Sequence, residues 1–253
     1  MNDVELFCQL AQNKCDMAKN DPIRFFTRAF MAGAYLGAAA ILAYTLGALL
    51  QDNVALSKIA VAGTFGVGLV AIVFLGAELF TGNCLVTIMP VLHKQMKLRE
   101  LIKPWILCYL GNAVGISLIC YLFIQSGAQQ SLLTSYLKPM MEAKLDFQIM
   151  DLLIKGILCN FIVCIAAYAG IKVKSETAKI VMIMLFVMAF VLPGFEHCIA
   201  NAGIFTLGMA QLGSVVNWSL LPMHMMISTI GNIIGGSLLL GVPVYMIFKP
   251  NLK

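Results

Sequence analysis

Residues 74–83 read FLGAELFTGN, and this run decides the fold. It lies inside an apolar window of about residues 56–91, whereas one membrane-spanning helix needs only ~20 apolar residues. Glycines on both sides of Glu78 free backbone N–H and C=O groups, and hydrocarbon cannot satisfy them. Such a break is tolerated only where protein or a solute path surrounds it. The run therefore predicts a helix that breaks near the middle of a membrane.

A second run of the same kind occupies residues 193–201, which read PGFEHCIAN. It interrupts another apolar window, at about residues 178–208, and it places Glu196 and His197 just after a Pro-Gly pair. The same argument predicts a second helix that is broken near mid-membrane.

Composition agrees with a bilayer as the solvent. Hydrophobic residues make up 60% of the 253 and charged residues 11%, and the mean hydropathy is +0.90, a balance that no soluble domain can solvate. The chain offers six spanning windows, at about residues 28–50, 56–91, 104–125, 148–171, 178–208 and 222–248. The fold class predicted is an all-α membrane protein of six transmembrane helices, of which the second and fifth are broken.

The two halves of the chain repeat each other. Residues 111–118 (GNAVGISL) match residues 231–238 (GNIIGGSL) at an offset of 120, and the glutamates of the two breaks, Glu78 and Glu196, lie 118 apart. A unit of three crossings used twice must enter the second time from the opposite face, so the repeats are inverted and the pathway lies between them. Taken singly, the G-N-x-x-G residues also suit close packing of helices. We expect one transmembrane domain over residues 1–253, with repeats at about 28–125 and 148–248 and residues 1–27 as a cytoplasmic arm.

Basic residues set the orientation. With a cytoplasmic N-terminus, the inner side carries 13 Lys and Arg residues and the outer loops carry three, namely Lys58, Lys138 and Lys144. The prediction is a multi-pass protein of the plasma membrane with both termini in the cytoplasm. The net charge of +5 then reflects orientation and gives no reason to expect a nucleic acid partner.

Three ionisable residues fall near the bilayer centre, where each costs ~2.5–3.5 kcal/mol on insertion scales: Glu78, Glu196 and His197. Either glutamate could hold its break in shape by accepting hydrogen bonds from freed backbone N–H groups. His197 has a reference pKa of ~6.5, so it could donate a hydrogen bond or a proton to an anion that has lost its water. His197 is the preferred pathway residue, and Asn201 follows it four residues further on.

The remaining histidines and the cysteines suggest no redox or metal centre. His93 and His224 lie near membrane boundaries and receive no functional role. The eight cysteines fall mostly in apolar stretches without C-x-x-C spacing, so they are interpreted as small hydrophobic residues, and no cofactor or metal is expected. The rival functions are a membrane redox enzyme, which would need facing axial histidines, and a membrane scaffold, for which a buried Glu-His pair would be costly.

Several runs in the same order resemble the formate/nitrite transporter family: residues 32–35 (AGAY), 74–83 (FLGAELFTGN), 155–164 (KGILCNFIVC), 194–201 (GFEHCIAN) and 231–236 (GNIIGG). The resemblance extends from about residue 14 to residue 248. It implies an aquaporin-like protomer, assembled as a homopentamer in membrane lipid, in which each protomer holds a pore for formate, nitrite, hydrosulfide or a similar small anion. It also implies a transport protein that is not an enzyme.

The resemblance also assigns residues. The family's central histidine falls on His197, the threonine that hydrogen-bonds it on Thr81, and a pathway asparagine on Asn160. The vestibule lysine before span four falls on Lys144. The apolar constrictions fall on Leu69, Leu79, Phe80 and Phe190. A channel and a rocking carrier both fit the inverted repeats.

Overall fold

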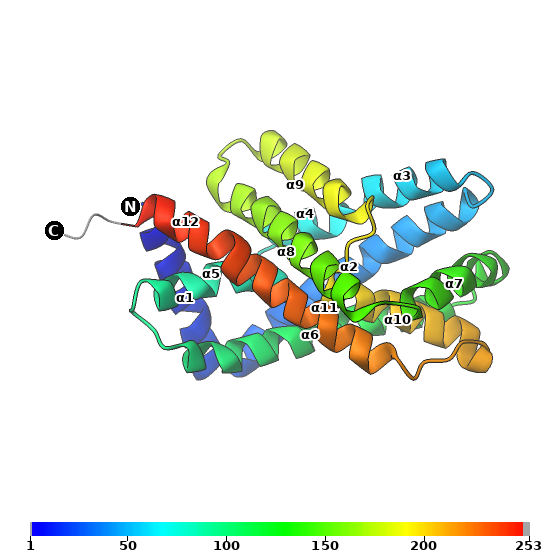
Figure 1. Cartoon of the computed structure of the whole chain (residues 1–253), viewed down its shortest axis with the longest axis horizontal. Coiled ribbons are helices and arrows are strands. Elements are labelled where there is room, and N and C mark those ends of the chain that lie inside the picture. The colour runs from blue at the N-terminus through cyan, green and yellow to red at the C-terminus, as the bar shows by residue number, and fades with distance from the viewer. Residues whose placement is uncertain (1, 250–253) are drawn as a thin grey trace.

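The computed structural model describes residues 2–249, and all regular structure among them is helical. Lys253, which was included in the inner count of basic residues, lies outside these residues. In chain order the helices are α1 (Asp3–Asn20), α2 (Pro22–Leu49), α3 (Val54–Phe65), α4 (Val67–Phe74), α5 (Phe80–Leu92), η1 (Leu98–Leu101), α6 (Ile102–Gln125), α7 (Gln130–Leu145), α8 (Ile149–Lys172), α9 (Glu176–Val191), α10 (Cys198–Leu212), η2 (Gly213–Val215), α11 (Leu221–Ile233), η3 (Ile234–Leu240) and α12 (Gly241–Phe248) (Figure 1).

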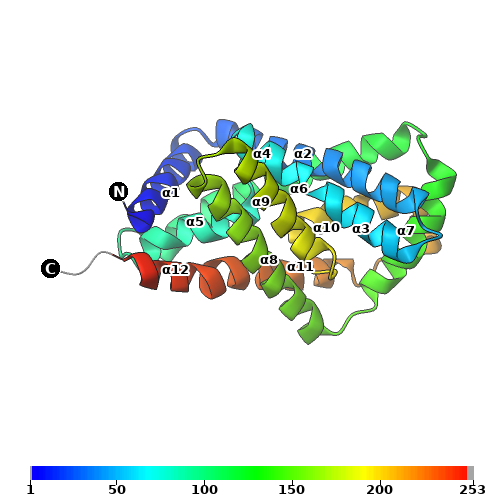
Figure 2. The same cartoon turned by 90° about the horizontal axis from the view of Figure 1, so that it is seen from above.

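Six stretches of the described chain are long and apolar enough to cross a membrane, and they confirm the predicted fold class. They are Pro22–Leu49, Val54–Phe74, Leu98–Gln125, Ile149–Lys172, Cys198–Val215 and Leu221–Phe248. Both termini of the described chain lie at one end of the molecule, together with α1 and α12, whereas α7 lies at the opposite end (Figures 1 and 2).

The second and fifth windows are each interrupted by a non-helical segment. The first break separates α4 from α5 over residues 75–79, and the second separates α9 from α10 over residues 192–197. Gly76 (φ +70°) and Gly194 (φ +78°) both adopt the left-handed backbone conformation that favours glycine. The chain can therefore leave one helix at each of these two points and start a new helix at mid-depth.

A buried asparagine pins each break. The Asn112 side chain accepts from the Phe80 N–H (2.8 Å) and donates to the Glu78 carbonyl (2.8 Å) and to the Ala29 carbonyl (2.7 Å). In the second half, Asn232 accepts from the Cys198 N–H (2.9 Å) and donates to the carbonyls of Glu196 and Gly156 (both 2.8 Å). These side chains satisfy the backbone groups that the breaks release.

The glycines of the repeated motif allow helices to approach closely, as the sequence suggested. A Cβ atom at Gly115 would lie 2.0 Å from the Phe30 carbonyl oxygen on α2, and one at Gly235 would lie 2.1 Å from the Ile157 oxygen on α8. Only glycine fits at such backbone contacts. The motif thus combines two duties, with glycines at the helix contact and asparagines at the break.

Candidate functional site

The two half-length helices meet at a buried histidine and threonine. Thr81 lies in the first turn of α5, and His197 is the N-cap of α10. The His197 Nε2 atom is 3.1 Å from Thr81 Oγ1, and its Nδ1 atom accepts a hydrogen bond from the Ala200 N–H (3.1 Å). Because Nδ1 is an acceptor, a neutral ring carries its proton on Nε2 and donates it to Thr81. The predicted central pair is therefore in contact.

Asn160 of α8 lies on the other side of the threonine. Its amide donates to the Thr81 carbonyl (3.2 Å) and to the Asn232 carbonyl (2.6 Å), and the side chain is fully buried. It therefore ties the start of α5 to α11, and both of its amide hydrogens are used in doing so.

An apolar cavity of about 10 Å³ adjoins His197, lined by Leu36, Phe65, Leu69, Leu79, Val163, Val187, Phe190 and His197. A cavity of that size holds about one water molecule. The Phe190 ring stacks on the His197 imidazole, with 5.9 Å between the ring centroids. The structure thus brings three predicted constriction residues, Leu69, Leu79 and Phe190, to the histidine.

The fourth predicted constriction residue, Phe80, points elsewhere. Its ring packs edge-on against Tyr109 (5.2 Å between centroids) and Trp105 (6.1 Å), in a separate apolar groove between α6 and α11. Phe80 does not line the small cavity, although Leu79 beside it does.

The end of the molecule that carries α7 contains a cavity of about 720 Å³, which reaches His197 and is here called the outer vestibule after the predicted orientation. Lys144, at the end of α7, donates to Glu196 Oε2 (2.6 Å) and to Asn201 Oδ1 (3.1 Å). Three predicted site residues therefore form one cluster. Lys144 is not a free charge, because the Glu196 carboxylate neutralises it.

His224 lies near the start of the last span, as the sequence indicated, but it is buried. His224, in the first turn of α11, is 1% exposed and lines the outer vestibule. Its Nε2 atom is 3.8 Å from Glu196 Oε2, and its Nδ1 atom is buried without a hydrogen-bond partner. Hydropathy placed the residue near the end of a span, but the vestibule extends inward past that depth.

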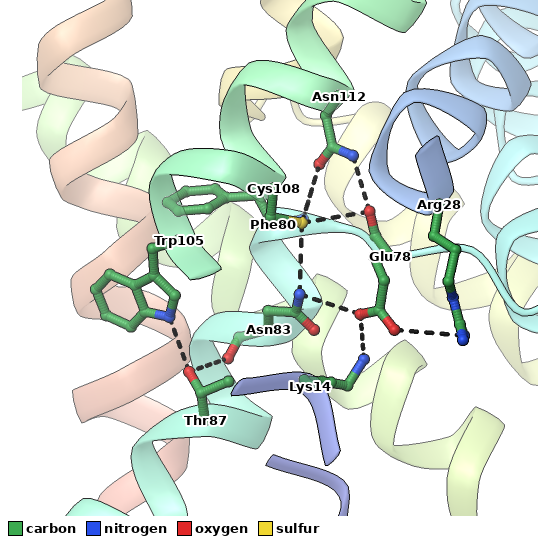
Figure 3. Close-up of polar contacts among 9 residues, drawn as sticks. All are labelled: Lys14, Arg28, Glu78, Phe80, Asn83, Thr87, Trp105, Cys108 and Asn112. Carbon is green, nitrogen blue, oxygen red and sulfur yellow. Dashed lines mark hydrogen bonds and ion pairs between the residues drawn. The ribbon is translucent and has the colours of Figure 1, made fainter. Parts of the chain in front are cut away.

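A matching cluster surrounds Glu78 at the other end of the pathway, and Figure 3 shows its side chains converging on the carboxylate. Lys14 of α1 pairs with Glu78 Oε2, the Arg28 guanidinium lies 3.4 Å from Oε1, and the Asn83 amide donates to Oε2 (3.2 Å). Both glutamates were expected to accept backbone N–H groups at the breaks. Instead, their carboxylates accept from lysine side chains, and the asparagines satisfy the backbone.

Lys14 is a residue that the sequence analysis missed. It lies in the N-terminal arm, which forms helix α1, and no spacing relates it to Glu78, 64 residues away. The repeat does not single it out either, because the offset of 120 leads from Lys144 to Arg24 and not to Lys14.

Six crossings with two half-length helices that meet at mid-depth define a class of membrane channels and transporters. The family model for formate/nitrite transporters matches residues 3–246, and the chain belongs to that family.

Its relatives include the nitrite transporter NirC of Escherichia coli (strain K12), which is 32% identical over 89% of this chain and 84% of that protein. An uncharacterised transporter of Bacillus subtilis (strain 168), YwcJ, is 30% identical over 94% of both chains. Among solved structures, an FNT family ion channel superposes with a TM-score of 0.89 at 27% identity, covering 96% of this chain and 98% of that one. A pentameric formate channel with formate bound shares the fold (TM-score 0.77, 24% identity, covering 91% of this chain and 98% of that one).

Proposed function

We propose that each protomer conducts a small monovalent anion, namely formate, nitrite or hydrosulfide, and that His197 links the flux to protons. The observation that carries this proposal is the buried Thr81–His197 pair at the meeting point of α5 and α10, next to a cavity with room for about one water molecule. A purely structural role beside this apolar cavity would not require a titratable side chain.

The apolar walls define the energetic problem. An anion that enters the cavity formed by Leu69, Leu79 and Phe190 loses hydration that these side chains cannot replace. The penalty is several kcal/mol or more. A conjugate acid such as formic or nitrous acid carries no charge and avoids most of it. A proton transferred to the anion at this point by the protonated form of His197, which is left as a neutral imidazole, therefore lets a weak acid cross where its anion cannot.

The flanking groups support the same role. The N-termini of α5 and α10 both lie at mid-depth, and the positive ends of helix dipoles favour negative charge there. His197 Nε2 can donate to a permeating oxygen or sulfur in place of Thr81 Oγ1. Asn160 keeps the start of α5 in position throughout.

We extend the proposal to assembly and location. The shared fold with a pentameric formate channel supports a homopentamer with one pore in each protomer. The excess of basic residues on the α1 side supports a plasma-membrane protein with cytoplasmic termini. The competing scaffold function would leave two buried charge clusters and a buried imidazole without a purpose.

Uptake into proteoliposomes tests the proposal. Labelled formate, nitrite and hydrosulfide, with lactate for comparison, are supplied at about pH 5.5 and about pH 7.5, on either side of the histidine reference value. Protein-free liposomes correct for the weak acid that crosses lipid unaided. Protein-dependent uptake should rise as the pH falls. No uptake of any of these anions above the liposome background would refute the function.

His197→Asn tests the histidine itself, because asparagine keeps hydrogen-bonding capacity while it removes the titratable proton. The variant should assemble normally and lose the rise in uptake at low pH. His93→Asn, at the end of α5 and away from the pathway, is the matched control. An intact His197→Asn oligomer with wild-type pH dependence would show that the histidine only braces the break.

A further inference from the structure

The charges that line the outer vestibule cancel. Three lysines and three carboxylates line it: Lys58, Lys144, Lys155, Asp146, Asp151 and Glu196. The cavity also contains two imidazoles, His197 at the inner limit and His224 beside Glu196. With both rings neutral, the cavity offers an incoming anion no net positive charge.

His224 is placed where its protonation would change this balance. Its Nε2 atom is 3.8 Å from Glu196 Oε2, the same oxygen that accepts from Lys144 at 2.6 Å. A protonated imidazole would therefore compete with the lysine for one carboxylate oxygen. The cluster of two cations and one anion would then carry a charge of +1.

Its surroundings hold the ring in position without supplying another partner. The rings of Phe147 and Phe205 lie perpendicular to the imidazole, at 5.3 and 5.1 Å between centroids. Perpendicular aromatic contacts suit a cationic ring as well as a neutral one. Nδ1 is buried without a hydrogen-bond partner in a ring that is 1% exposed. An apolar side chain would satisfy this packing better, so a structural role alone does not explain a histidine here.

The charged groups that line the cavity together with His224 come from several segments. Glu196 precedes α10, and Lys144 ends α7. Asp146 follows α7, and Asp151 and Lys155 begin α8. The lysines oppose protonation of the imidazole and the carboxylates favour it, and Glu196 is the nearest of them.

The other half of the protein provides an internal comparison. At the Glu78 cluster, two permanent cations, Lys14 and Arg28, face one carboxylate. At an offset of 120, the counterpart of His224 is Pro104, which cannot titrate. The inner cluster is therefore always positive, whereas the outer cluster is positive only when the histidine is protonated.

We propose that His224, Lys144 and Glu196 form an outer capture site for a monovalent anion, and that protonation of His224 switches this site on. The inference rests on the proposed function, which supplies the anion as substrate. It adds a second proton-dependent step, separate from the one at His197. Acid outside then raises the anion concentration in the vestibule before the apolar constriction is reached.

Magic-angle-spinning NMR of the full-length protein in lipid tests the site without any flux measurement. The chain has three histidines, so ¹⁵N-histidine labelling gives three pairs of ring signals, which His93→Gln and His197→Asn assign. The titration midpoint of His224 should move to higher pH when sodium formate replaces sodium gluconate, because binding and protonation are reciprocal. A His224 signal that neither titrates nor responds to formate would overturn the proposal.

Uptake by His224→Gln adds the functional readout. Net charge in a cleft changes anion capture by tenfold or more, so the variant should lose a roughly tenfold increase in the initial rate on external acidification. His93→Gln is the control, and oligomer size is checked on the same preparations. If His224→Gln keeps the full acid response, the capture site is refuted while the proposed function stands. If wild-type protein conducts no anion, the proposed function fails, and the NMR titration still decides whether the site binds formate.

Discussion

The pairing of Lys144 with Glu196 leads to a quantitative prediction for Lys144→Met. The Nζ–Oε2 distance is 2.6 Å, and the two side chains are 18% and 10% exposed. Methionine keeps the length of the side chain but leaves a buried carboxylate without its main partner. Breaking such a pair costs ~3–5 kcal/mol, and residual solvent contact at Lys144 places the expected loss of unfolding free energy near ~3 kcal/mol.

A double-mutant cycle measures this coupling. Lys144→Met, Glu196→Gln and the double variant are unfolded chemically in detergent micelles, with intrinsic tryptophan fluorescence as the signal. The double variant should be more stable than Lys144→Met, because it leaves no unpaired charge, and the coupling should reach ~2 kcal/mol. Lys138→Met, on the exposed face of the same helix, is the matched control and should change stability by less than ~0.5 kcal/mol. Additive single effects would refute the pairing as a source of stability.

Three further predictions concern the breaks, the N-terminal arm and the topology. Asn112→Leu removes three buried hydrogen bonds and leaves the Phe80 N–H unpaired at ~1–3 kcal/mol, so it should lower the yield of assembled oligomer, and a wild-type yield in size-exclusion chromatography would contradict the pinning role. Burial of Asp3 opposes its ionisation, but hydrogen bonds from Lys172 and Tyr168 outweigh burial and lower its pKa from 3.8. The resulting stabilisation of α1 is present above that value and is lost only as the pH falls through the lowered pKa. Asp3→Asn should therefore increase proteolysis of α1 equally from about pH 5 to about pH 8, and a difference that disappears within this range would contradict the assignment. A cysteine at Gln129 should react with an impermeant maleimide added outside cells, and labelling only after lysis would reverse the topology.

The spans and breaks could be predicted because their signals are local. A run of ~20 apolar residues needs a bilayer wherever it occurs. Gly76 and Gly194 stand close to a glutamate inside an apolar run, and both adopt the left-handed conformation. The repeat offset then related the two halves without any contact information.

The partners of the buried charges depend on tertiary packing and could not be read in the same way. Lys14 reaches Glu78 only because α1 docks against α5, and nothing in its neighbourhood marks it among the basic residues of the arm. The constriction shows a similar limit. Leu79 is the extended N-cap of α5 and Phe80 is its first residue, and their side chains line different cavities. Which cavity each residue lines depends on the helices packed around it and could not be predicted from the sequence.

The two halves hold their helix breaks in the same way, but they differ in the charged residues beside the two glutamates. Asn112 and Asn232 pin equivalent breaks, and Lys14 and Lys144 pair with equivalent glutamates. The second basic residue beside each glutamate differs between the two clusters. Arginine is charged at every cellular pH, so Arg28 gives the inner cluster a fixed positive charge. His224 stands beside the outer glutamate, and an imidazole, unlike a guanidinium, has both a neutral and a charged form. The switch proposed at His224 therefore has no counterpart at the Glu78 cluster, and it would add a response to pH at the α7 end of the pathway to the one proposed at His197.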